Sequence, residues 1–311
     1  MEKKLAIGVD IGGSHINCAA IDLESASVLK ETGADRPVNN QASATSIITV
    51  WASCLAEVFE KVPADQILGI GVAMPGPFDY INGICLIHGV AKYENLYGFN
   101  IGDALVSSLD VPDNFQVRFI NDASAFAVGE AWAGKASEVK RSVSITLGTG
   151  FGSAFVVDKI PVCNGSDVPE KGCVYHLPFN GNIADESFST RWFLRKYNKL
   201  SGKEAMGVKE LADIADTDKS VMDLFVQYGD NMGSFLAPWL NRFRAEKLVI
   251  GGNISNSYKL FGSVFEERLK KEKCSVKVEL SELKEDAALL GSGYLFNDNF
   301  WKAVQHTLPL M

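Results

Sequence analysis

Several features that mark whole classes of proteins are missing from this sequence. Its 311 residues carry 30 basic and 38 acidic side chains, a net charge of −8, which argues against a nucleic-acid partner because such partners need a basic surface. The six cysteines include no CxxC pair, so neither a zinc ribbon nor a disulfide framework is indicated. The first apolar run stops at Asp10, and none reaches membrane length. We therefore expect a cytoplasmic protein with no membrane or nucleic-acid partner.

The two commonest nucleotide-binding fingerprints are missing as well. Neither GxGxxG nor GxxxxGK[ST] occurs in the chain, which argues against Rossmann and P-loop phosphate sites. The chain is long enough for about two domains, and its 47% content of hydrophobic residues is typical of a folded protein.

Glycine turns between short apolar segments are the clearest positive feature. Residues 5–9 and 16–21 predict two strands around Gly12-Gly13-Ser14, and residues 142–146 and 153–157 predict two more around Gly148-Thr149-Gly150. This repetition, about 140 residues apart, indicates two related halves. A third turn, Gly251-Gly252, follows a strand expected at 247–250. Backbone N–H groups in such turns can converge on phosphate oxygens, although a tight hairpin turn is the simpler interpretation of each one alone.

The other segments alternate between strand and helix patterns. Strands are predicted at 67–73 and 116–120, and helices at 41–62 and from 121 to 133. An apolar stripe from Phe225 to Phe243 predicts a core helix. A last helix is expected to begin near Asp286 and to carry Gly291 and Gly293 on its surface. The fold class is therefore mixed α/β.

Two aspartates stand out because each directly follows an apolar strand segment. Asp10 precedes the first glycine turn, and Asp122 follows the strand expected at 116–120. A carboxylate at such a place is costly to bury without a partner. One of the two would organise a metal and phosphate, and the other would act as a general base; the alternative is that both only cap strand ends. Their position among glycine turns favours the chemical interpretation.

The order of these motifs resembles the ROK family of sugar kinases, bacterial glucokinase-like enzymes, over nearly the whole chain. The matching segments are GVDIGGSHINCAAID (8–22), GIGVAMPGPFD (69–79), NLYGF (95–99), FINDASAFAVGEAWAG (119–134), LGTGFGSAFVVD (147–158), LVIGGNIS (248–255) and DAALLGSG (286–293). Seven matches in order are far more specific than any single turn.

The resemblance implies the two-lobed actin/hexokinase-type ATPase fold, with a ribonuclease H-like repeat. Residues 1–117 and 294–311 would form the smaller lobe and residues 118–293 the larger, with the active-site cleft between them. The implied reaction is ATP-dependent phosphorylation of a hexose or amino sugar. The family commonly forms dimers, so a homodimer is expected.

The resemblance also assigns roles to single residues. Asp122 would be the general base, and Asn121 would contact sugar hydroxyls. Asp10 would lie near Mg²⁺, through water, because Mg²⁺ keeps most of its water ligands. Phosphates and adenosine would be bound by the three glycine turns: Gly12, Gly13 and Ser14; Gly148, Thr149 and Gly150; Gly251 and Gly252.

The sequence departs from the family between residues 172 and 186. The family pattern Gly-Glu-x-Gly-His is followed there by cysteines that hold zinc, whereas this chain has Cys173 in place of the Glu and no cysteine after His176. No zinc site is therefore expected, although Cys163, Cys173 and His176 leave a residual metal site open. His176 and Glu186 are the candidate sugar contacts, and Glu170 is a weaker substitute for the missing Glu.

Two other functions compete with a sugar kinase. A sugar-binding, degenerate kinase-like protein is suggested by the altered segment around Cys173, but the aspartates and glycine turns argue against it. A ROK-type repressor would need a DNA-binding helix-turn-helix, and the first phosphate motif begins within ten residues of Met1. We therefore expect the kinase.

Overall fold

The computed structural model describes residues 4–89, 92–112 and 114–311. The chain divides into two compact units. The first comprises Met1–Ser137, Lys159–Pro161 and Glu285–Met311, and the second comprises Glu138–Asp158 and Val162–Lys284. Each unit has its own hydrophobic core.

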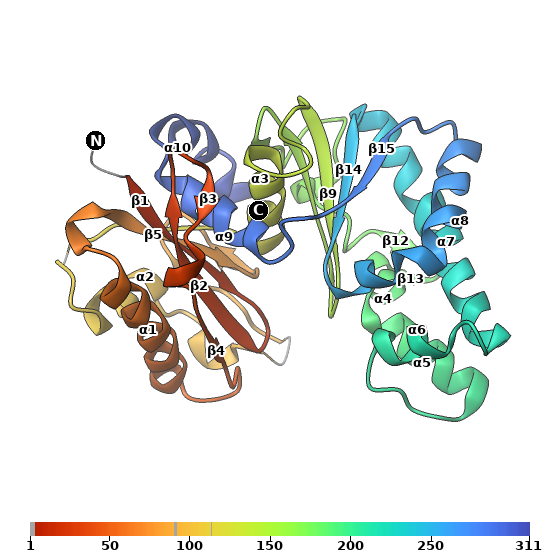
Figure 1. The fold of residues 1–311 in the computed structure, drawn as a ribbon, viewed down its shortest axis with the longest axis horizontal. Coiled ribbons are helices and arrows are strands. Elements are labelled where there is room, and N and C mark those ends of the chain that lie inside the picture. Colours follow the sequence, from red (N-terminus) through yellow and green to blue (C-terminus); the bar gives the residue numbers. More distant parts are fainter. Residues whose placement is uncertain (1–3, 90–91, 113) are drawn as a thin grey trace. The chain divides into compact units, whose positions relative to one another are not determined.

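The first unit is built on a six-stranded sheet with helices packed against it (Figure 1). The strand order is β3-β2-β1-β5-β8, and β4 pairs with β2. The strands are β1 (Leu5–Ile11), β2 (His15–Asp22), β3 (Ser27–Val28), β4 (Ala34–Pro37), β5 (Ile67–Met74) and β8 (Val117–Asn121), with a separate small hairpin of β6 (Phe78–Asp79) and β7 (Ile84–Cys85). The helices are α1 (Ala44–Lys61), α2 (Ile101–Ser108), α3 (Asp122–Trp132), α9 (Asp286–Gly293) and α10 (Asp298–Val304).

The second sheet has the strand order β11-β10-β9-β14-β15. Its strands are β9 (Arg141–Leu147), β10 (Phe151–Val157), β11 (Ile160–Pro161), β14 (Lys247–Gly251) and β15 (Lys277–Leu280), and a small hairpin is formed by β12 (Pro178–Phe179) and β13 (Asn182–Ile183). The helices of the second unit are α4 (Ala184–Phe188), α5 (Thr190–Ser201), α6 (Val208–Ile214), α7 (Lys219–Phe243) and α8 (Tyr258–Lys271).

The two sheets repeat one arrangement, as the glycine turns predicted. In the first sheet β1 is antiparallel to β2 and parallel to β5, and in the second β9 is antiparallel to β10 and parallel to β14. Each antiparallel pair is joined by one of the glycine turns. Each turn therefore leaves the central part of its sheet, where buried neighbours fix the strand that carries it.

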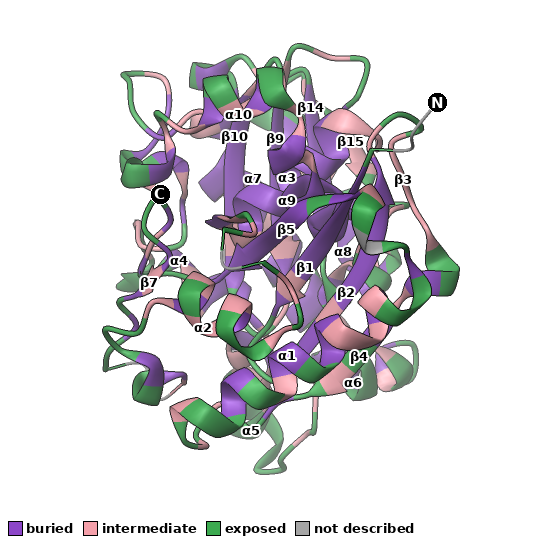
Figure 2. Ribbon diagram, turned by 90° about the vertical axis from the view of Figure 1, so that its left-hand side faces the viewer, coloured by how far each residue is buried: buried purple, intermediate pink, exposed green. Residues whose placement is uncertain are grey.

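Helices α3 and α9 pack so closely that their backbones touch. A side chain at Gly129 of α3 would begin 1.9 Å from the carbonyl oxygen of Ala287, and one at Gly291 of α9 would begin 1.9 Å from that of Ala125. The expectation that Gly291 and Gly293 lie on a helix surface was wrong: every residue of α9 from 287 to 293 is buried, as Figure 2 shows in purple. These glycines allow the close approach and so fix α3, whose first residue is Asp122.

The core of the second unit is rich in aromatic side chains. Phe225, Tyr228 and Phe243 of α7 are almost completely buried, which confirms the core helix predicted from the apolar stripe. Their rings contact others from α5 and β10, including Phe193 and Phe155. Well-packed aromatic clusters of this kind supply much of the burial energy of a core, so α5 and its polar face are held firmly.

Within the described residues, no helix combines the length and the apolar character needed to cross a membrane. The lobes expected from the sequence, 1–117 with 294–311 and 118–293, differ from the compact units over three segments: 118–137, which contains α3, 285–293, which contains α9, and 159–161. Compact units are defined by contacts and lobes by movement, so the sequence boundaries stay a prediction.

Candidate functional site

The first glycine turn, between β1 and β2, has its carbonyl oxygens occupied. The hydroxyl of Tyr93 donates to the carbonyl oxygen of Gly12 at 2.6 Å, and the amide of Asn40 donates to that of Gly13. The Gly12 N–H closes the turn on the carbonyl of His15. Among the described residues, no acceptor faces the N–H groups of Gly13 and Ser14. These two backbone donors could bind an anion, and the phosphate role expected of this turn stays a prediction.

Asp10 and Asp122 come to the same edge of the first sheet. Asp10 pairs in register with Ala73 of β5, and the next residue of β5, Met74, pairs with Asn121 of β8, which immediately precedes Asp122. These strands are parallel, so their carboxyl ends share one edge. The sequence placed both aspartates at strand ends, and the topology brings them together.

The electrostatic environment of Asp10 is unusual. Burial, with the negative charges of Asp122 and Glu285, raises the pKa of Asp10 to about 7. No described ion pair includes Asp10 or Asp122. A cation at this edge would offset three carboxylates, and their oxygen atoms suit Mg²⁺, which is typically held by one or two carboxylates together with water and phosphate. Asp10 therefore fits the role of an Mg²⁺ neighbour, although no set of three ligands among the described residues forms a complete protein cage.

Asp122 is held by one of its two carboxylate oxygens. Its Oδ1 accepts from the backbone N–H of Ala123 at 2.8 Å and from the side-chain amide of Asn121 at 3.0 Å. That amide also donates to the Tyr80 hydroxyl at 3.3 Å, and Asn121 Oδ1 caps α3 by accepting from the N–H of Ser124. Among the described residues nothing donates to Oδ2 of Asp122. The carboxylate is therefore oriented and keeps one oxygen free to accept a proton.

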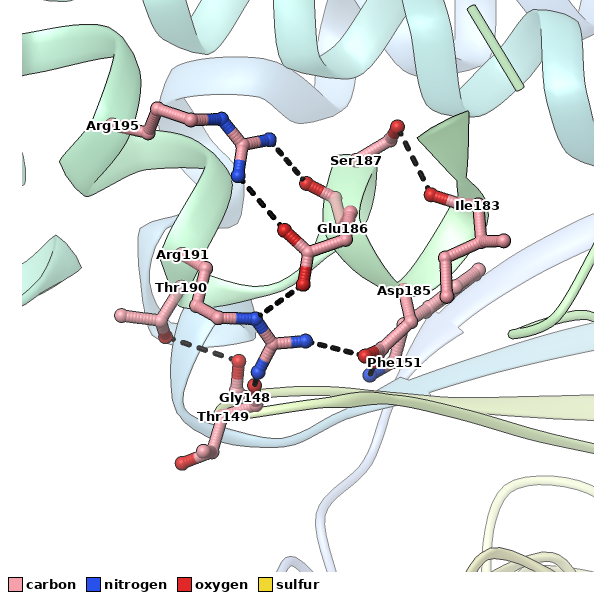
Figure 3. Close-up of polar contacts among 10 residues, drawn as sticks. All are labelled: Gly148, Thr149, Phe151, Ile183, Asp185, Glu186, Ser187, Thr190, Arg191 and Arg195. Carbon is pink, nitrogen blue, oxygen red and sulfur yellow. Dashed lines mark hydrogen bonds and ion pairs between the residues drawn. The ribbon is translucent and has the colours of Figure 1, made fainter. Parts of the chain in front are cut away.

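The second glycine turn, between β9 and β10, is fastened to the segment that leads into α5 (Figure 3). The backbone N–H and the hydroxyl of Thr190 both donate to the carbonyl oxygen of Gly148, at 2.8 and 3.0 Å. Arg191 donates to the carbonyl oxygen of Thr149 at 2.7 Å. The N–H of Phe151 donates to Asp185 at 2.7 Å. As in the first turn, the carbonyl oxygens are taken.

Glu186 belongs to a network of two acids and two arginines. Its carboxylate accepts from Arg191 and from Arg195, each at 2.8 Å, and Arg191 also pairs with Asp185. The hydrogen bonds from Arg195 and Arg191 hold the pKa of Glu186 below its usual range. Glu186 therefore stays ionised at neutral pH, and both of its oxygens are engaged in the protein.

The third turn lies against the second. Gly252 has φ of +81°, and a side chain there would begin 2.5 Å from the carbonyl oxygen of Leu147, the last residue of β9. Gly251 pairs in register with Thr146. The structure thus places Gly251 and Gly252 against the end of β9 that leads into the second turn, and their expected contact with adenosine stays a prediction.

The altered segment places His176 beside Cys173. The ring nitrogen Nδ1 of His176 lies 3.9 Å from the sulfur of Cys173, and burial raises the pKa of that thiol to about 11. The segment is tied to the second sheet through the N–H of Val174, which donates to Ser153. The segment that carries His176 is thus fixed on β10, and the expected sugar contact of His176 stays a prediction.

Sequence reasoning missed the side chains that fasten the turns. Tyr93, Asn40 and Arg191 are distant in sequence from the carbonyl oxygens they bind, and no motif marked them. Glu285 was missed as well, although it directly precedes the recognised segment 286–293. Its position one residue before a buried helix was the only available signal.

Comparison with known proteins finds a family model and relatives that match nearly the whole chain. The family model of the ROK family matches residues 6–299. A glucokinase from Thermotoga maritima is 28% identical over 96% of this chain and 99% of its own length. A xylose repressor from Caldicellulosiruptor bescii is 24% identical, covering 92% of this chain and 76% of the repressor.

A solved structure shows the same fold. The ROK family glucokinase from Streptomyces griseus, in complex with glucose and AMPPNP, superposes with a TM-score of 0.73 at 20% identity and covers 94% of this chain and 98% of its own. The chain has the actin/hexokinase-type ATPase fold of these kinases. With a family model that spans residues 6–299, the chain belongs to the ROK family.

Proposed function

We propose that this protein phosphorylates a hexose or amino-sugar hydroxyl with ATP, and that Asp122 is the general base. The single observation that supports this best is the environment of Asp122: one oxygen is fixed by Ala123 and Asn121, and the other accepts from no described group. Its relatives include glucokinases, which supports a sugar kinase.

In the proposed mechanism, Oδ2 of Asp122 accepts the proton of the attacking sugar hydroxyl. Asn121 keeps the carboxylate oriented, because both hydrogens of its amide are used on Tyr80 and Asp122. Its Oδ1 retains one lone pair for a sugar hydroxyl. A base held in this way contributes through correct placement as well as through proton transfer.

The glycine turns would bind the phosphates of ATP. The N–H groups of Gly13 and Ser14 in the first turn, and those of Thr149 and Gly150 in the second, are the donors we propose. Mg²⁺, when bound, would neutralise phosphate charge, and Asp10 would hold its water ligands. Phosphoryl transfer depends chiefly on such placement and charge neutralisation, which these residues supply without a surplus of lysine and arginine.

The substrate side is proposed to include His176 and Glu186. Each oxygen of Glu186 already accepts one hydrogen bond from an arginine, but a carboxylate oxygen has a further lone pair that can accept from a sugar hydroxyl. The two arginines that hold Glu186 belong to α5, so a sugar contact at Glu186 would depend on the position of that helix.

A panel of sugars tests the proposal. The protein is incubated with ATP, Mg²⁺ and each of several hexoses and amino sugars, and ADP release is followed by a coupled assay while calorimetry measures sugar binding. We expect sugar-dependent ADP release with at least one of them. Measurable sugar binding without ADP release for the whole panel would instead favour a sugar-binding protein that has lost the kinase reaction.

A further inference from the structure

In the second glycine turn the carbonyl oxygens accept hydrogen bonds from the protein, whereas two of the N–H groups donate to none of the described residues. Thr190 donates twice to the carbonyl oxygen of Gly148, and Arg191 donates to that of Thr149. The N–H groups of Thr149 and Gly150 donate to no acceptor in the described part of the chain. The orientation of the peptide planes in this turn is therefore set by its carbonyl partners.

Arg191 is the only charged partner of these carbonyls among the described residues, and it makes three contacts at once. Its Nη1 donates to Thr149 O at 2.7 Å, its Nε to Glu186 at 2.8 Å, and its Nη2 pairs with Asp185 (Figure 3). A guanidinium is a planar fork of five donors, and it can hold three partners in fixed directions, which an ammonium cannot do. The contact with Thr149 is therefore directional.

The two acids that Arg191 contacts, Asp185 and Glu186, are held by other hydrogen bonds as well. Asp185 accepts from the N–H of Phe151 at 2.7 Å, directly after the turn, and its own N–H donates to the carbonyl of Tyr175 at 2.9 Å. Glu186 is held from its other side by Arg195 at 2.8 Å. A side chain at Gly150 would begin 3.3 Å from Asp185, so the segment lies tightly against the turn.

The charges in this network cancel. Two carboxylates, Asp185 and Glu186, face two guanidiniums, Arg191 and Arg195. The positive charge of Arg191 is matched by its own partners, although 42% of its side chain is exposed. The donors of this turn that have no acceptor among the described residues are the backbone N–H groups of Thr149 and Gly150.

We propose that Arg191 is a positioning residue of the nucleotide site: by bonding Thr149 while anchored on Asp185 and Glu186, it keeps the N–H groups of the second turn directed at the phosphates of the bound nucleotide. This rests on the proposed ATP-dependent function. It assigns to Arg191 an effect on triphosphate affinity that acts through the turn, with no requirement for direct contact between the guanidinium and the phosphates.

Equilibrium binding in the absence of sugar tests this directly. Calorimetry with Mg²⁺ measures the affinity of the intact protein for AMPPNP, a non-hydrolysable triphosphate, and for adenosine, which has no phosphate. In Arg191→Gln we expect AMPPNP to bind about 10- to 100-fold more weakly, because charged hydrogen bonds that fix the donors are lost. Adenosine should bind within about threefold of the wild type, which also shows that the variant is folded.

Arg195→Gln is the matched control. It removes the same charge from the same carboxylate, Glu186, but Arg195 makes no contact with the turn in the described structure. Its AMPPNP affinity should stay within about threefold of the wild type. An equal loss in Arg191→Gln and Arg195→Gln would overturn the proposal, since the network's charge and not the contact with Thr149 would then be responsible.

Arg191→Lys distinguishes positioning of the turn by Arg191 from simple attraction between its positive charge and the phosphates. It also replaces Arg191→Gln in the test if the glutamine variant does not fold. An ammonium retains the charge but cannot bind Thr149, Asp185 and Glu186 together, so we expect at least about a fivefold loss of AMPPNP affinity. Full affinity in the lysine variant would contradict positioning.

The same measurement distinguishes this proposal from the proposed function. A wild-type chain that binds AMPPNP but phosphorylates no sugar refutes the kinase and leaves the role of Arg191 to be judged on the variants. A wild-type chain that binds AMPPNP no better than adenosine refutes the phosphate role of the turn, and the role of Arg191 with it.

Discussion

Two pairs of carboxylates lie beside the two glycine turns, and their surroundings are opposite. Asp10 and Asp122, in the first unit, have no cationic partner among the described residues, and the pKa of Asp10 is raised. Asp185 and Glu186, in the second, are neutralised by Arg191 and Arg195, and the pKa of Glu186 is lowered. The same residue types near the same kind of turn thus have opposite charge environments. We therefore expect the acids without a cation to matter most for catalysis, and the acids paired with arginine to matter most for the position of the second turn.

The largest expected effect is on catalysis by the unpaired acids. Asp122→Asn keeps the shape of the side chain but removes the base, so kcat should fall by about 10²- to 10⁴-fold while AMPPNP affinity is retained. Steady-state kinetics and calorimetry measure the two quantities. Asp185→Asn is the control from the paired acids: it keeps an oxygen for the N–H of Phe151, and we expect it to change kcat by less than about tenfold. Similar losses in both variants would erase the distinction between the pairs.

The next effect is on stability, and it arises from Asp10. Its folded pKa, about 7, lies above its ordinary value of 3.8, so ionising it destabilises the folded state. The penalty is absent below the ordinary pKa, grows as the pH rises towards 7 and is complete above that. Without Mg²⁺, Asp10→Asn should therefore raise the free energy of unfolding by about 1–3 kcal/mol at pH 8.

Chemical denaturation at several pH values measures this change. The gain in Asp10→Asn should shrink towards zero near pH 4, where Asp10 of the wild type is protonated as well. A gain that is the same at pH 8 and pH 4 would show that the substitution acts through packing and not through charge.

A smaller effect compares how the two turns are fastened. Tyr93→Phe removes the neutral hydroxyl that donates to Gly12, whereas Arg191 fastens the second turn with a charged group. One neutral hydrogen bond contributes about 0.5–1.5 kcal/mol, so KM for ATP should rise only about 2- to 10-fold, less than in Arg191→Gln. Tyr97→Phe, at a tyrosine that is 56% exposed, is the control and should leave KM unchanged. A larger rise in Tyr93→Phe than in Arg191→Gln would reverse the comparison.

The smallest effect concerns the stability that Glu186 contributes. Its lowered pKa means that the stabilisation is present above the ordinary carboxyl pKa and is lost as the pH falls through the folded value, the opposite direction to Asp10. Because a third of its side chain is exposed, Glu186→Gln should cost less than about 1 kcal/mol at pH 7. Thermal unfolding of Asp10→Asn and Glu186→Gln from pH 4 to pH 8 measures the change in stability relative to the wild type. With rising pH this change should become more stabilising in Asp10→Asn and more destabilising in Glu186→Gln. A cost in Glu186→Gln that grows at low pH would contradict the assigned ion pairs.

The sequence predicted what local patterns determine. The strands around both glycine turns, and the helix after Asp122, were expected within a few residues of where they lie, because each has a continuous apolar segment and a clear stop. Asp10 and Asp122 were recognised for the same reason, since a carboxylate directly after a buried strand is a local feature. Their shared sheet edge follows from the parallel pairing of β1, β5 and β8, which the structure shows.

What the sequence did not predict depends on contacts between distant segments. Tyr93 reaches Gly12 across 81 residues, and nothing near Tyr93 marks it as a partner of a turn. Gly291 was expected at a helix surface, but it is buried. The close approach of Ala125 from α3 becomes visible only when both helices are packed. The arginines on Glu186 are close in sequence, but the resemblance directed attention to a sugar contact instead.

The most direct test of the account is whether phosphate moves from ATP to a sugar. ³¹P NMR of the wild-type protein with ATP, Mg²⁺ and the sugar that gives the fastest ADP release follows every phosphorus species at once. We predict that one phosphomonoester of the sugar appears in the same amount as ADP. If inorganic phosphate accumulates in place of a sugar phosphate, or if the spectrum of ATP does not change with any sugar of the panel, the account is contradicted.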